Sequence, residues 1–103
     1  MKLRYGLLLL IAVTAIRTAL AADAESGKRI AMSRCAACHL VEPNQLGLAA
    51  GSESPPFEVI AAKFKSNPES LASFILAPHA RMNMTISPRE AADVAAYILT
   101  LAK

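Results

Sequence analysis

Apolar side chains in the second half of the chain recur at every third or fourth position, which is the spacing of an amphipathic helix. One such run follows a pair of prolines and consists of Phe57, Ile60, Ala61 and Phe64. A longer run near the C-terminus consists of Ala91, Val94, Ala95, Ile98 and Leu99. No window alternates apolar and polar residues over the length of a strand. The pattern therefore predicts an all-α protein.

Two predicted helices flank a long loop. Asp23 can cap a first helix over Ala24–Arg34, which has no proline, and Met32 in this helix is expected to be a core residue. Residues 41–56 contain three prolines, two glycines and two serines, a composition typical of a loop. A second helix is predicted over 57–64. Loops of this length usually enclose another group.

Two further helices are predicted from their end signals. Asn67 caps a helix over 68–77 that Pro78 stops, and its expected apolar face consists of Leu71, Phe74 and Ile75. The sequence Ser-Pro-Arg-Glu from Ser87 to Glu90 is a capping box with proline at the first helical position. It predicts the start of the last helix, which continues to residue 101.

The chain has too little bulky material to fill a core by itself. It has 103 residues, no tryptophan, three phenylalanines and two tyrosines, so it forms one small domain and a multidomain enzyme is excluded. Domains of this size usually need a disulfide, a metal or a cofactor. The composition therefore predicts that another group fills the centre.

Residues 1–22 have the pattern of a secretory signal peptide, with a basic start, an apolar stretch and small residues at the end. The apolar stretch 7–16 would span about 15 Å as a helix, which is half of a hydrocarbon core of about 30 Å, so stable membrane insertion is not expected. The small residues predict cleavage after Ala21 or Ala22. The domain over 23–103 is therefore expected in the periplasm.

The basic character of the whole chain comes from this leader. The formal net charge is +3, and three of the eleven basic residues are Lys2, Arg4 and Arg17. Residues 23–103 hold eight basic and eight acidic groups, a net charge of zero. No nucleic-acid partner is therefore expected.

The segment from Cys35 to His39 reads Cys-Ala-Ala-Cys-His, the attachment motif of c-type haem. Two thiols three positions apart on a helical turn point the same way and can add to the two vinyl groups of the haem. The following histidine can then present its Nε2 atom to the iron. The motif predicts one covalent haem c per chain, bound through Cys35 and Cys38, with His39 as an iron ligand.

Two other uses of these residues are weighed against haem. A disulfide between Cys35 and Cys38 would suit a thioredoxin-like motif, but such motifs accompany a βαβ pattern that the sequence lacks. Zinc could recruit both cysteines with His39 and His79. The usual spacing of two ligand pairs is missing, and adjacent Cys38 and His39 fit one tetrahedron poorly.

With this motif the mature chain resembles the small class I monohaem cytochromes c of the bacterial periplasmic type. The resemblance extends from Gly27 to Leu101. It matches Gly27 to the small residue where the first and last helices cross, and Tyr97 to an aromatic residue at that crossing. It implies a cytochrome c fold of about four short helices wrapped around the haem.

The resemblance also implies the remaining haem contacts. A methionine before the last helix binds the second face of the iron, and Met82 matches this position better than Met84, while His79 is a weaker alternative. A proline carbonyl in the loop after the motif accepts a hydrogen bond from the ligating histidine. Pro56, or Pro55 beside it, matches that position.

The function implied is that of a periplasmic one-electron carrier, not an enzyme, which exchanges electrons with a redox protein donor and acceptor as a monomer. Two alternatives are a haem-bearing relay subunit docked to an oxidoreductase and a haem sensor that binds a small ligand.

Overall fold

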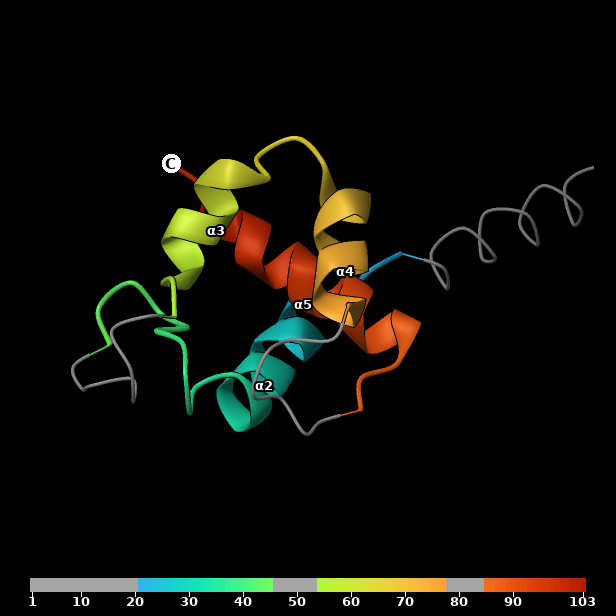
Figure 1. Cartoon of the computed structure of the whole chain (residues 1–103), viewed down its shortest axis with the longest axis horizontal. Helices are drawn as coiled ribbons and strands as arrows, with labels where there is room; N and C mark the ends of the chain where they lie inside the picture. The colour runs from blue at the N-terminus through green and yellow to red at the C-terminus, as the bar shows by residue number, and fades with distance from the viewer. Residues whose placement is uncertain (1–20, 46–53, 78–84) are drawn as a thin grey trace, which may run out of the picture.

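The computed structural model describes residues 21–45, 54–77 and 85–103, and these form helices without strands. The helices are α2 (Ala24–Arg34), α3 (Phe57–Lys63), α4 (Pro68–Leu76) and α5 (Pro88–Thr100). Helix α5 lies at the centre, with α2 crossing it on one side and α3 and α4 on the other (Figure 1). Within the described part of the chain, no helix is long and apolar enough to span a membrane.

The crossing of α2 and α5 brings two backbones into direct contact at Gly27. A Cβ atom on Gly27 would lie 1.9 Å from the carbonyl oxygen of Asp93 and 2.9 Å from the nitrogen of Val94. No side chain fits into that space, so the helices can approach this closely only with glycine at this position. The role that the resemblance implied for Gly27 is therefore confirmed.

The buried core lies around α5 and is built mostly from small and branched side chains. It contains Ala31, Val41, Phe57, Ala61, Leu71, Ala91, Val94, Ala95, Tyr97 and Ile98. Tyr97 donates a hydrogen bond of 2.6 Å from its hydroxyl to the carbonyl oxygen of Val41. This bond ties the segment that follows the Cys-His motif to the central helix.

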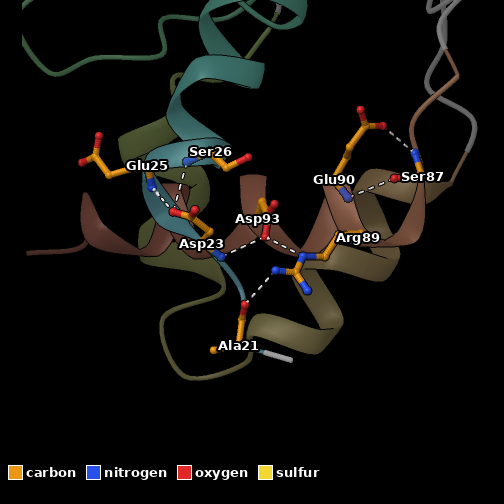
Figure 2. A network of polar contacts seen from close by, with 8 residues as sticks. All are labelled: Ala21, Asp23, Glu25, Ser26, Ser87, Arg89, Glu90 and Asp93. Atoms are coloured by element: carbon orange, nitrogen blue, oxygen red, sulfur yellow. Dashed lines mark hydrogen bonds and ion pairs between the residues drawn. The ribbon is translucent and has the colours of Figure 1, made fainter. Parts of the chain in front are cut away.

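The helix boundaries agree with the sequence prediction to within one residue. Asp23 caps α2 by accepting hydrogen bonds from the amides of Glu25 and Ser26. The capping box of α5 is complete, because the Ser87 hydroxyl accepts from the Glu90 amide and the Glu90 carboxylate accepts from the Ser87 amide (Figure 2). The prediction of an all-α fold is confirmed.

Two residues, one expected in the core and one on the apolar face of its helix, are exposed. Met32 is 51% exposed and Phe74 is 53% exposed. Helix α2 faces α5 with Gly27 and Ala31, one turn apart, and the position after Ala31 is turned about 100° away from that face. Phe74 contacts Phe64 at a ring distance of 5.7 Å, outside the main core.

Candidate haem attachment site

The segment from Cys35 to His39 forms a hydrogen-bonded turn at the C-terminal end of α2. Cys35 caps the helix, and its amide donates to the carbonyl oxygen of Ala31 at 2.8 Å. The carbonyl oxygen of Cys35 accepts from the amides of Cys38 at 3.2 Å and His39 at 2.9 Å. The chain thus continues past the end of α2 as a hydrogen-bonded turn that holds both cysteines and the histidine.

Both sulfurs of the motif are free thiols. Cys35 is half-buried and Cys38 is exposed. Burial raises the pKa of the Cys35 thiol, and the nearby guanidinium of Arg34 partly offsets this effect. The structure therefore holds no disulfide between the two positions. It also groups no set of three histidine, cysteine or acidic side chains that could hold a metal ion within residues 21–45, 54–77 and 85–103.

The imidazole of His39 is held in one orientation by a backbone carbonyl. Its Nδ1 atom lies 2.7 Å from the carbonyl oxygen of Pro55. Because a carbonyl can only accept, Nδ1 carries the proton in this contact, and in the neutral ring the lone pair is then on Nε2. This neutral tautomer is the form that ligates a metal, and the hydrogen bond raises the basicity of the free nitrogen.

The carbonyl that reaches His39 belongs to Pro55, not to Pro56. Pro56 is the N-cap of α3, and its carbonyl oxygen accepts from the amides of Val59 at 3.0 Å and Ile60 at 3.2 Å. That oxygen is therefore directed along α3. The preference for Pro56 over Pro55 as the histidine's partner is wrong for this reason, while the expected type of contact is present.

Two contacts of Phe57 support the histidine from the protein interior. The ring of Phe57 lies 5.4 Å from that of His39 and 6.4 Å from that of Tyr97 on α5. The amide of Phe57 donates to the carbonyl oxygen of Leu40 at 2.9 Å, directly after the motif. The start of α3 and the end of the motif are thereby fixed to each other.

Sequence reasoning missed the part played by Arg34, next to Cys35. Its guanidinium lies 3.1 Å from the Glu90 carboxylate and reaches the carbonyl oxygen of Thr85 at 3.5 Å. It therefore links the attachment motif to the segment that leads into α5. A basic residue in the last turn of a helix is common, and nothing in the sequence near Arg34 indicated its distant partners.

The proposed ligands of the second iron face lie outside the described residues. These are Met82, its alternative Met84, and His79. The described donor set fits haem c: two free thiols three positions apart in a hydrogen-bonded turn, followed by an imidazole that the Pro55 carbonyl orients through Nδ1. Such a set defines a covalent haem protein of the c type.

Comparison with known proteins identifies the family. The cytochrome c family model matches residues 24–102. The chain is also 40% identical over 98 residues to cytochrome c-552 of Bradyrhizobium diazoefficiens. This alignment covers 93% of this chain and 92% of that protein. No solved structure matches. The chain belongs to the cytochrome c family, whose members carry electrons on covalently attached haem c.

Proposed function

We propose that this protein is an exported one-electron carrier, not an enzyme, in which Cys35 and Cys38 hold the haem and His39 and Met82 are the axial ligands of its iron. The observation that carries the proposal is the 2.7 Å contact between His39 Nδ1 and the Pro55 carbonyl oxygen. It places the lone pair of the neutral imidazole on Nε2, as an iron ligand requires.

The haem supplies an iron that gains and loses a single electron. The chain's own residues would control that iron from His39 outward. The Pro55 carbonyl keeps the proton on Nδ1, so the ring can neither rotate nor change tautomer without breaking this bond. The ring of Phe57 packs against the imidazole and connects it to Tyr97 on α5. A ligand held in this way changes little in position between two oxidation states.

A methionine as second ligand would favour the reduced iron and raise the reduction potential. Met82 is the proposed residue, and Met84 is the alternative. If His39 and a methionine both bound the iron, no position would be left open for a substrate. This is why we propose a carrier and not an enzyme.

The sequence supports the proposed compartment and partners. We propose that residues 1–22 are a signal peptide and that residues 23–103 form the periplasmic domain. That domain has a net charge of zero, so electrostatic steering by its overall charge is weak. Its donor and acceptor are expected to be redox proteins that meet a monomer in brief encounters.

Spectra of the wild type, Met82→Ala and Met84→Ala, produced with a working haem maturation system, test this proposal. We expect Met82→Ala to become high-spin and to lose the charge-transfer band of methionine-ligated ferric haem. Met84→Ala, a matched loss of one thioether, should keep both properties of the wild type.

The opposite pattern would move the ligand to Met84. Wild-type protein that lacks the mass of a haem would overturn the proposal. Ready binding of carbon monoxide by the reduced wild type would favour a sensor, and stable co-purification with a larger oxidoreductase would favour a relay subunit.

A further inference from the structure

Asp93 is the one charged side chain that is buried in the described part of the chain. Its residue is 5% exposed, and it lies on α5 where α2 begins. A buried carboxylate is unfavourable unless it is paired and hydrogen-bonded. The partners of Asp93 therefore indicate what this position requires.

The partners of Asp93 come from the N-terminal end of the described chain and from its own helix. Its Oδ1 atom accepts a hydrogen bond of 2.8 Å from the backbone N–H of Asp23. The same oxygen lies 3.4 Å from Nε of Arg89, one turn earlier on α5. Arg89 is 55% exposed and also donates from Nη2 to the carbonyl oxygen of Ala21 at 3.1 Å (Figure 2).

This network surrounds the two bonds at which the signal peptide is expected to be cut. We propose that Asp93 is a receptor for the α-ammonium group that cleavage creates, and that the mature N-terminus is held against α5 by this ion pair. The inference rests on the export proposed above. Hydrolysis of the peptide bond consumes one water and leaves a new carboxylate on the leader and a new amine on the domain.

Either predicted cut places the new charge near Asp93. Cleavage after Ala22 converts the Asp23 N–H, already 2.8 Å from Oδ1, into the ammonium itself. Cleavage after Ala21 leaves the ammonium on Ala22, and one residue spans at most about 3.6 Å, so the charge stays within about 6.5 Å of that oxygen. An opposite charge this close favours the charged form of the new amine, most strongly for the cut after Ala22.

The other charges around the new terminus do not replace Asp93. Arg89 on α5 already pairs with Asp93 from the solvent side and repels a second cation. The carboxylates of Asp23 and Glu25 on α2 are exposed, and that of Asp23 caps the helix. An exposed carboxylate attracts a nearby cation only weakly, because water screens it. Among the acidic groups near the new terminus, Asp93 is the one whose carboxylate is buried and therefore less screened by water.

The test measures the α-amino group of the mature, haem-loaded protein. Its pKa can be obtained from the pH dependence of reductive methylation, with mass spectrometry to locate the label. We expect a pKa about one unit above the usual 7.7–8.0, which is a tenfold slower reaction at neutral pH. Asp93→Asn should restore the usual value, whereas Glu25→Gln, an exposed acid in the first turn of α2, should not.

The wild type alone also decides the question if Asp93→Asn does not fold. Its α-amino pKa is then compared with that of the same chain unfolded in urea, and equal values would overturn the inference. A mature N-terminus at neither Ala22 nor Asp23, or an equally raised pKa in Asp93→Asn, would also overturn it. A chain that keeps its leader would instead refute the proposed export, so the two failures are distinguishable.

Discussion

Replacing Gly27 by alanine tests the crossing of α2 and α5, on which the fold depends. The new Cβ would lie 1.9 Å from the Asp93 carbonyl oxygen and 2.4 Å from its carbon. Both are backbone atoms, so no side chain can rotate away. To reach an ordinary contact of at least 3.4 Å, the helices must move apart by about 1.5 Å, in an interior that is otherwise close-packed.

The magnitude follows from three contributions. Overpacking of a core costs about 1–3 kcal/mol, and contact with rigid backbone places this case at the upper end. The displacement also weakens the hydrogen bond from Asp23 to Asp93, a loss of about 1 kcal/mol. Alanine regains about 1 kcal/mol in helix propensity. We expect a net loss of about 3 kcal/mol, a large fraction of the 5–15 kcal/mol that is usual for a domain.

Urea unfolding of the haem-loaded protein, followed by circular dichroism, measures this loss. With a slope of about 1.5 kcal/mol per molar urea, the midpoint should fall by about 2 M. Ser33→Ala, at an exposed position of the same helix, is the control and should shift the midpoint little. A Gly27→Ala variant as stable as the wild type would refute the close crossing of the two backbones.

Two further predictions concern α5 and its start. Tyr97→Phe removes the 2.6 Å hydrogen bond to the carbonyl oxygen of the buried Val41. It should lower the free energy of unfolding in urea by about 1–2 kcal/mol without changing the slope. An unchanged urea midpoint would contradict this contact. The Ser87 amide, and next the Arg34 guanidinium, hold the pKa of Glu90 below its usual 4.5. The stability that this pairing contributes is present above pH 4.5 and is lost as the pH falls through the lowered pKa of Glu90. Glu90→Gln should therefore make the free energy of unfolding depend less on pH in this acidic range. A variant whose stability falls with pH as steeply as that of the wild type would contradict the prediction.

Local signals explain which parts of this fold the sequence could predict. The capping box at Ser87 and Glu90 fixes the start of α5 through atoms only three positions apart, and Asp23 and Asn67 act in the same way for α2 and α4. The spacing of Cys35, Cys38 and His39 is also local. Such features depend on neighbours in the chain, so a pattern of residue types is sufficient to find them.

Contacts between distant segments could not be predicted in this way. Periodicity shows that a helix has an apolar face, but the crossing partner decides which residues of that face are covered, and Met32 and Phe74 lie outside it. Pro55 and Pro56 are adjacent residues of the same type, and only the path of the backbone shows which carbonyl reaches His39. Asp93 resembles any solvated acid on a helix until α2 is placed against it.

The central position of α5 explains how so small a core can hold a histidine firmly. Tyr97 on α5 contacts the segment after the motif through Val41 and the ring beside the histidine through Phe57. Phe57 contacts His39 on one side, while Pro55, two residues before it, binds the Nδ1 atom. The imidazole is thus fixed by a ring contact and a hydrogen bond from one short segment that α5 anchors. A change that loosens this anchor would reach His39 without altering any residue of the attachment motif.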